Sequence, residues 1–360
     1  MKLNLITAFL IGIVVSVVAI ADTFTLKDNH PKTHQVVKGD TLWDISAHFL
    51  NSPWLWPRLW QENSQIKNPH LIYPGEILTL IWVDGEPRLS RKRLKKLSPT
   101  PRLQEKQAAI PTIPLASVSA FLSRDHVLDP AILAGAPRLL GDINATPRFF
   151  EGDVFYGEGK YDKDKLYGVY RLGVNYIDPV SKEFLGKQLI FIGHSEVSKN
   201  PNFSSTEQVT PHDFISSSRE ARQGDLILPI PEYATLPAYF LPQSVPKTIK
   251  GQIIGALNNS RAIGKWDIVV INRGQRDNIK IGSMFSVLQS GPGILINKTR
   301  VVYQDNASNF GQMGSPDIKI PAQRVGELLV FRVYDKLSIA MVMRSTEVMA
   351  ANNKIQGLEF

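Results

Sequence analysis

The chain has 360 residues, which is enough for two or three domains with separate hydrophobic cores. Its 43% hydrophobic content excludes a wholly disordered chain, and its lack of cysteine excludes disulfides and thiol catalysis. The net charge of +8 would suit a nucleic-acid partner, but most of this excess lies in one segment, because residues 81–110 contain eight basic and three acidic residues. Because the basic run at 88–96 contains no aromatic residue, we expect no nucleic-acid partner.

The first 21 residues have the pattern of a secretory signal peptide. Lys2 precedes a mostly apolar run at 3–20, and Ala19-Ile20-Ala21 forms an A-x-A cleavage site. The sequence predicts export, with cleavage after Ala21. The alternative is an uncleaved anchor, because the run approaches the roughly twenty apolar residues that span a bilayer.

The next segment begins with a predicted strand and helix. A short extended run around Val36 ends at Gly39-Asp40, a pair suited to a tight turn, and Asp40 or Thr41 offers a cap to a helix. The apolar residues of that helix recur at three- and four-residue spacing, at Leu42, Ile45, Phe49 and Leu50.

A second helix and a returning strand follow. Pro53 fits the first turn of the second helix, which we expect to end near Asn63. Tyr73-Pro74-Gly75 predicts a type II turn, with Gly at the position that requires positive φ, and 77–80 predicts a strand. Residues 33–82 therefore predict a β-α-α-β unit.

Three patterns in this unit resemble the LysM family over essentially its whole length. They are V-x-K-G-D-T-L-W from Val36, W-x-x-N from Trp60 and I-Y-P-G-E-x-L from Ile72. His34 stands where the family usually has Tyr, and the stretch 51–58 is longer and richer in Trp than in minimal members. The wider chain is similar to proteobacterial periplasmic proteins with a LysM peptidoglycan-binding domain.

The resemblance implies a shallow groove for polymers that contain N-acetylglucosamine, such as peptidoglycan or chitin. The groove residues that it implies are Gly39, Asp40, Thr41, Leu42, Asn68, Pro69, Leu71, Ile72 and Tyr73. Leu42 and Ile72 would form an apolar pocket for the acetyl methyl, with Ile72 on the rim. The alternative is that Gly39, Asp40 and their counterparts in the second turn serve only turn geometry.

Four tryptophans lie close together in this unit. Trp43 and Trp60 fall at apolar helical positions and are expected in the core, whereas Trp54 is the best candidate for an exposed, sugar-stacking side chain.

A basic, proline-containing linker is expected at 83–112. It is interpreted as a solvated tether, with contact to an anionic envelope surface as the alternative. Short helices are expected at 113–136, from helically spaced leucine and valine and from the cap and stop residues of Asp129-Pro130 and Gly135.

The remaining chain predicts two β domains, at 137–232 and 246–350, and the fold class is therefore α+β. Two segment pairs suggest a duplication, with chance similarity as the alternative. Gly152-Asp153-Val154-Phe155 resembles Trp266-Asp267-Ile268-Val269, and Leu185–Phe191 resembles Val325–Phe331. Each domain is expected to be a small barrel or sandwich.

The sequence predicts no enzyme. His126, His194 and His212 lack the spacing of zinc ligands, no G-x-S-x-G elbow occurs, and no metal or cofactor is expected. The alternative is a cryptic cell-wall glycan hydrolase with a distant carboxylate pair. The leading hypothesis is a non-catalytic, cell-wall-associated periplasmic protein that binds peptidoglycan or another N-acetylglucosamine-containing glycan, while its β domains act as a scaffold for an unknown envelope protein.

Overall fold

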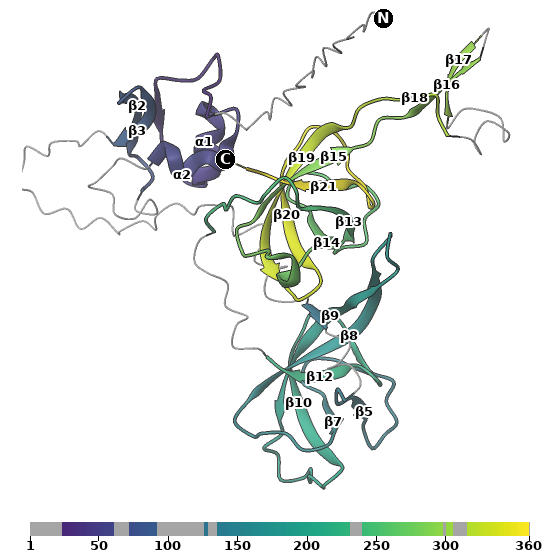
Figure 1. Ribbon diagram of the computed structural model, residues 1–360. Coiled ribbons are helices and arrows are strands. Elements are labelled where there is room, and N and C mark those ends of the chain that lie inside the picture. The colour runs from purple at the N-terminus through teal and green to yellow at the C-terminus, as the bar shows by residue number, and fades with distance from the viewer. Residues whose placement is uncertain are drawn as a thin grey trace, which may run out of the picture.

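The computed structural model describes residues 24–60, 72–91, 126–128, 135–230, 240–297, 300–304 and 315–359. These residues form a small amino-terminal module with helices and two mainly β units, of which the second carries a long projecting hairpin (Figure 1). The mixed α and β composition agrees with the predicted fold class.

The amino-terminal module is built on a three-stranded antiparallel sheet with the order β1-β2-β3. Its elements are β1 (Thr33–Gln35), α1 (Leu42–Phe49), a 3-10 turn (Pro53–Leu55), α2 (Trp56–Trp60), β2 (Ile77–Val83) and β3 (Glu86–Arg91). The predicted β-α-α-β order is confirmed, and β3 extends it. The apolar faces of both helices are buried against the sheet, because the side chains at helical spacing share one side.

The third strand corrects the predicted start of the linker. Asp84 and Gly85 form a two-residue turn with positive φ at both positions, the geometry that fits the twist of a hairpin. The strand beyond it is not solvated, because Leu89 is fully buried and Arg88 donates to the carbonyl of Arg58 at 2.6 Å. The remainder of the predicted linker, 92–112, lies outside the described residues.

The first β unit contains a seven-stranded sheet and a separate two-stranded sheet, β11-β6. Six strands of the larger sheet follow the order β12-β8-β9-β10-β7-β5, and the seventh, β4, pairs with β9. Its strands are β4 (His126–Leu128), β5 (Leu139–Gly141), β6 (Arg148–Phe149), β7 (Val154–Glu158), β8 (Leu166–Ile177), β9 (Phe184–Val197), β10 (Val209–Ser217), β11 (Ala221–Arg222) and β12 (Leu226–Pro229). β4 corrects the prediction of helices at 113–136 for residues 126–128, because β9 offers these residues a strand edge. The predicted helical stretches 113–125 and 129–134 lie outside the described residues.

The second β unit is a closed barrel with the strand order β13-β14-β20-β19-β15-β21. Its strands are β13 (Lys250–Ala256), β14 (Ile268–Ile271), β15 (Met284–Gln289), β19 (Gln323–Val333), β20 (Ser338–Ser345) and β21 (Lys354–Gly357), with a 3-10 turn at Gln275–Asp277. A predicted end at 350 is too early, because β21 closes the barrel by pairing with both β13 and β15.

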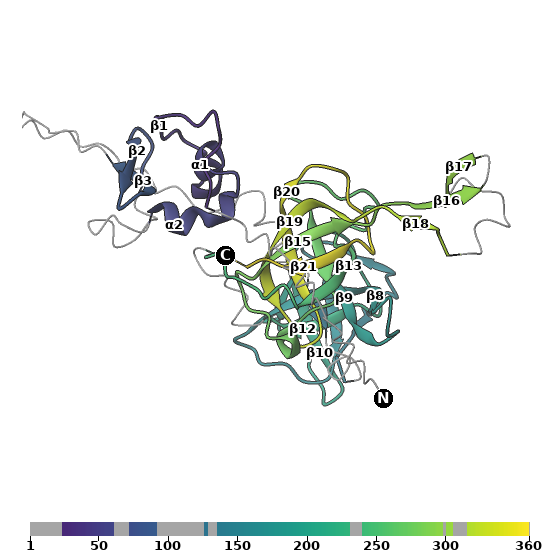
Figure 2. The same cartoon turned by 45° about the horizontal axis from the view of Figure 1, so that its top comes forward.

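A three-stranded hairpin sheet leaves the barrel between β15 and β19. It consists of β16 (Gly293–Asn297), β17 (Arg300–Tyr303) and β18 (Ile318–Lys319), in the order β17-β16-β18. It projects from the barrel in two views of the molecule (Figures 1 and 2).

The two β units share one topology. The sheet order of the first unit becomes the barrel order of the second when six strands of each are matched in chain order. The matched pairs are β5 with β13, β7 with β14, β8 with β15, β9 with β19, β10 with β20 and β12 with β21. A bridge between Arg138 and Leu226 joins the two ends of the first sheet, where β13 and β21 pair in the second unit. Of the two segment pairs that suggested a duplication, 152–155 and 266–269 hold matched positions before and on β7 and β14. Segments 185–191 and 325–331 lie on the matched strands β9 and β19 but out of register, because Ser195 pairs with Phe214 where Leu328 pairs with Val342.

Matched hydrogen bonds align the units residue by residue. The Gly152 N–H donates to the Phe214 carbonyl and the Trp266 N–H donates to the Val342 carbonyl, each at 2.8 Å. Both donors have positive φ and precede the aspartates of the repeated segments. These shared backbone contacts support a duplicated origin of the two β units.

Candidate functional site

Two loops of the amino-terminal module lie side by side, at 37–41 and 72–76. The Val36 N–H donates to the Glu76 carbonyl at 2.9 Å, and the Gly75 N–H donates to the Val36 carbonyl at 2.7 Å. The two loops that the sequence implied as the sides of a groove are therefore joined by the backbone at the end of β1.

The first loop is held by Asp40. Its Oδ2 accepts a hydrogen bond from the Val37 N–H at 3.0 Å and lies 2.9 Å from Nε2 of His34. Gly39 is exposed, and its φ of +103° is a conformation that favours glycine, although a Cβ there would meet no atom within 4 Å. The loop therefore presents a well-defined, accessible stretch of backbone at Gly39.

Thr41, one of the two residues that the sequence offered as a cap, caps helix α1. Its Oγ1 accepts the Asp44 N–H at 3.0 Å and donates to the Asp44 carboxylate at 2.7 Å. Thr41 is buried, so its hydroxyl serves the helix terminus rather than an exposed surface.

The second loop contains the predicted type II turn. The Glu76 N–H donates to the Tyr73 carbonyl at 3.2 Å, and Gly75 has a φ of +92°. The Glu76 carboxylate accepts the Tyr73 N–H at 3.2 Å and pairs with Arg91 of β3 at 3.0 Å. Because β3 supplies Arg91, the added strand fixes the loop that carries Tyr73.

Burial corrects part of the predicted groove. Leu42 and Ile72 are fully buried in the module core, so the expectation that they form a pocket for an acetyl methyl, with Ile72 on the rim, is wrong. Both are large aliphatic side chains that the helix and sheet cover, which removes more apolar surface from water than a rim position would. Asn68, Pro69 and Leu71 lie outside the described residues.

Trp43 and Trp60 are buried as predicted, but the prediction of an exposed Trp54 is wrong. Trp54 is fully buried, like Trp43 and Trp56, so it offers no exposed face for a sugar in the intact chain. Trp82, near the end of β2, is 63% exposed. The Asp84-Gly85 hairpin signal, which places Trp82 beside a turn, was the sequence feature that could have revealed it.

Among the described residues of the implied site, the accessible groups are therefore more polar than the sequence suggested. Gly39 offers exposed backbone, and Asp40 and Tyr73 are half-buried between the two loops. His34 and Glu76 add polar side chains that the sequence analysis did not assign, each 17–24% exposed. Such groups can exchange hydrogen bonds with the amides and hydroxyls of a carbohydrate.

The described residues contain no group of three or more His, Cys, Asp or Glu side chains placed to hold a metal ion. In the part of the chain that the structure describes, no helix is long and apolar enough to cross a membrane.

Comparison with known proteins identifies this module. Residues 34–80 match the model of the LysM domain family, so the chain contains a LysM domain. LysM domains bind glycans that contain N-acetylglucosamine, such as peptidoglycan.

A relative of the chain is the uncharacterized protein YqbP of Bacillus subtilis, strain 168. The two are 37% identical over 60 residues, which cover 14% of this chain and 27% of YqbP. The chain therefore spans about a quarter of the length of this relative.

Proposed function

We propose that this is a non-catalytic, exported protein of the bacterial periplasm that its LysM domain attaches to peptidoglycan. The observation that carries the proposal is the LysM match at 34–80, together with two joined loops in which Gly39 is exposed and Tyr73 is half-buried. The β units then act as a scaffold for other envelope components.

We place the sugar-contacting surface at Gly39, Asp40 and Tyr73. Thr41, Leu42 and Ile72 support this surface from the core and do not contact the sugar directly. Because Asp40 and Glu76 are charged acceptors held by backbone N–H groups and by Arg91, they are positioned before a ligand arrives.

Five carboxylates in the described part of the β units are unsuited to act as the general acid of a glycan hydrolase. A glycan hydrolase needs a general acid whose pKa is raised. Hydrogen bonds or cations instead stabilise the charged form of these five carboxylates and lower their pKa values. They are Asp142, Asp162, Asp178, Glu183 and Glu220. Zymogram activity from the purified chain on peptidoglycan would overturn this part of the proposal.

Cosedimentation with insoluble peptidoglycan tests the attachment. The intact protein should pellet with the glycan, and a chain that lacks residues 34–80 should remain in the supernatant. Replacing Tyr73 by alanine should weaken retention, whereas replacing the distant exposed Val348 by alanine should not. Retention that survives the deletion would show that another part of the chain is the anchor.

A further inference from the structure

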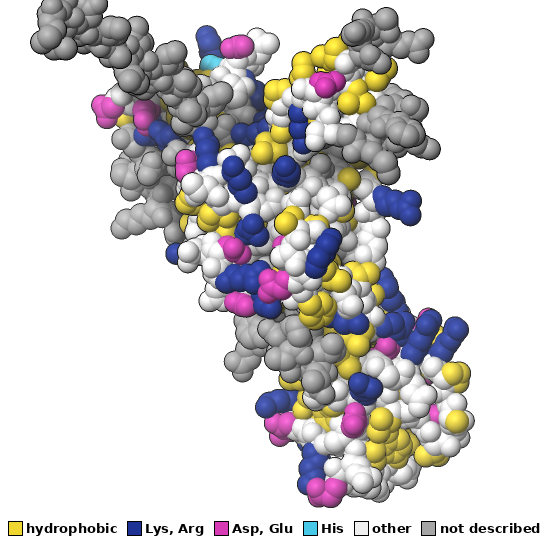
Figure 3. Space-filling view, turned by 45° about the vertical axis from the view of Figure 1, so that its right-hand side comes forward, with side chains coloured by type: hydrophobic (Ala, Val, Ile, Leu, Met, Phe, Trp, Pro, Cys, Tyr) yellow, Lys and Arg dark blue, Asp and Glu magenta, His cyan; other side chains and the backbone are white. Residues whose placement is uncertain are grey.

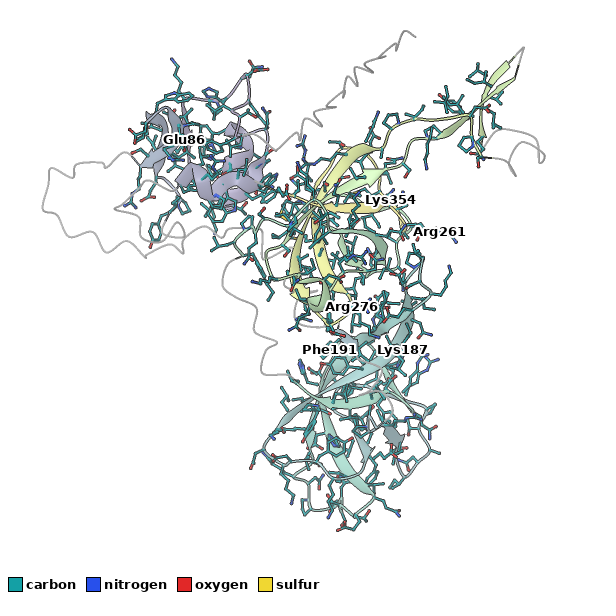
Figure 4. All side chains as sticks on the ribbon, in the orientation of Figure 1. Glu86, Lys187, Phe191, Arg261, Arg276 and Lys354 are labelled. Carbon is teal, nitrogen blue, oxygen red and sulfur yellow. The ribbon has the colours of Figure 1, made fainter. Side chains whose placement is uncertain are left out.

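The long β8–β9 hairpin of the first unit docks on the barrel of the second. We call its outer part, residues 172–190, the first arm. Figure 4 shows Lys187 of this arm and Arg276 of the barrel on the two sides of the junction. Gln188 donates to the Leu257 carbonyl at 2.9 Å, and the buried Asn272 donates to Asp178 at 2.7 Å.

Charge and apolar contacts complete this junction. Glu183 at the tip of the first arm forms a two-bond ion pair with Arg276, each contact at 2.9 Å, and also pairs with Lys336. Tyr176 and Leu185 of the arm are buried in the same cluster as Leu257. The barrel therefore has a receiving face that a hairpin of the neighbouring unit covers.

The duplication places a second arm at the matched position of the second unit. β8 and β9 correspond to β15 and β19, so the β16–β18 hairpin is the counterpart of the first arm. We call this projecting hairpin the second arm (Figure 1). Pairing of Ile294 with Tyr303 and Ile318, and of Ile296 with Val301, puts these five residues on one face.

That face of the second arm is apolar and open to solvent. Ile296, Val301, Tyr303 and Ile318 are each more than half exposed. Hydrophobic atoms gather on this arm at the top of the space-filling view (Figure 3). Contiguous exposed apolar surface on a soluble protein marks an interaction site.

The duplication also gives the first unit a receiving face. The Glu158 N–H donates to the Arg138 carbonyl, as the Asn272 N–H donates to the Gln252 carbonyl, which fixes the alignment of the two faces. A hollow of about 470 Å³ lined by Arg138 and Glu158 matches one of about 530 Å³ lined by Gln252 and Asn272 beside the docked first arm.

Burial differs at matched apolar positions of the two faces. Leu257, under the first arm, is 3% exposed, whereas its counterpart Ile143 is 81% exposed. Ile254 packs against the core cluster at the junction, whereas its counterpart Leu140 is 38% exposed. The first unit therefore has the apolar residues of a receiving face without the hairpin that covers them in the second unit.

We propose that the second arm of one molecule docks on this uncovered face of the first unit of a second copy of the chain. The contact repeats between molecules the arrangement that joins the two units within one molecule. Because arm and face are different surfaces, the contact is head to tail, and it produces a ring if the rotation closes and a filament if it does not.

Charge at the face disfavours the wrong arm. Glu158 stands at the place of Asn272, so it would repel Asp178 at the tip of a first arm from another copy. The second arm carries one charge of each sign near this face, Asp317 and Lys319, so its net charge there is zero and Glu158 does not repel it as a whole.

The experiment measures the mass of the intact protein by sedimentation velocity over a wide concentration range, without glycan. The proposal predicts mass that rises with concentration above that of a single chain, to a dimer if two copies exchange arms and to larger species if they do not. Ile143→Asp on the face and Val301→Asp on the second arm should each weaken association at least tenfold. Both side chains are more than two-thirds exposed, so neither change should unfold its unit.

Mixing the two variants tests the direction of the contact. Ile143→Asp keeps an intact arm and Val301→Asp keeps an intact face, so an equal mixture should form dimers and nothing larger. Val348→Asp, at a residue 69% exposed on neither surface, is the matched control and should assemble as the parent does. A protein that stays monomeric at every concentration overturns the proposal, and so does assembly that Ile143→Asp leaves unchanged.

Discussion

Replacing Ile72 by alanine should destabilise the LysM domain rather than merely weaken its binding. Ile72 is fully buried in the cluster that contains Leu42 and Ile45. Truncating a buried isoleucine to alanine removes transfer free energy and leaves a cavity, which together cost about 2–5 kcal/mol. We expect about 3 kcal/mol, a large fraction of the stability of a module of this size.

Tryptophan fluorescence follows this change selectively. Of the six tryptophans, Trp266 alone lies outside the LysM region, so the emission of the chain reports mainly on that domain during urea unfolding. Tyr73→Ala, at a half-buried position beside Ile72, is the matched control and should shift the midpoint much less. If Ile72→Ala left the midpoint unchanged but abolished glycan binding, Ile72 would be a contact residue and the burial argument would be refuted.

Three further predictions concern pH and capping. Burial lowers the pKa of His212 to about 4, so the unfolded chain binds more protons than the folded chain between about pH 6.5 and 4. The first β unit should therefore lose up to about 3 kcal/mol of its free energy of unfolding as pH falls through that window. Calorimetry should show a smaller loss in the His212→Phe variant. Arg276 and Lys336 lower the pKa of Glu183 to about 2, so the ionised carboxylate stabilises the docked first arm fully above about pH 4.5. As pH falls toward 2 the arm should loosen, and hydrogen exchange should show a loss of protection there. Thr41→Ala should cost about 1 kcal/mol through loss of the helix cap, and a change of more than 3 kcal/mol in urea unfolding would contradict a simple capping role.

The sequence predicted features that depend on neighbouring residues. The Gly39-Asp40 turn, the Thr41 cap and the turn at Tyr73-Pro74-Gly75 all form where their residue types require them. These elements have local causes, because backbone conformation and caps are decided within a few residues. The same logic would have found β3 from Asp84-Gly85.

The features that the sequence did not reveal depend on contacts between distant segments. Ile72 and Trp54 sit at positions whose burial is decided by which element packs over them, and spacing alone does not specify that element. Closure of the barrel by β21 and docking of the first arm on Leu257 join residues far apart in the chain. Such pairings leave no local pattern from which they could be predicted.

The glycan-binding surface is tested most directly by titrating the isotope-labelled intact protein with a soluble N-acetylglucosamine oligomer and following the amide chemical shifts. Glycan binding at the LysM loops predicts saturable shifts at Gly39, Asp40 and Tyr73, with the amides of both β units unchanged. Shifts confined to the β units, or none at a millimolar concentration of the oligomer, would contradict the assignment of the LysM loops as the glycan-binding site.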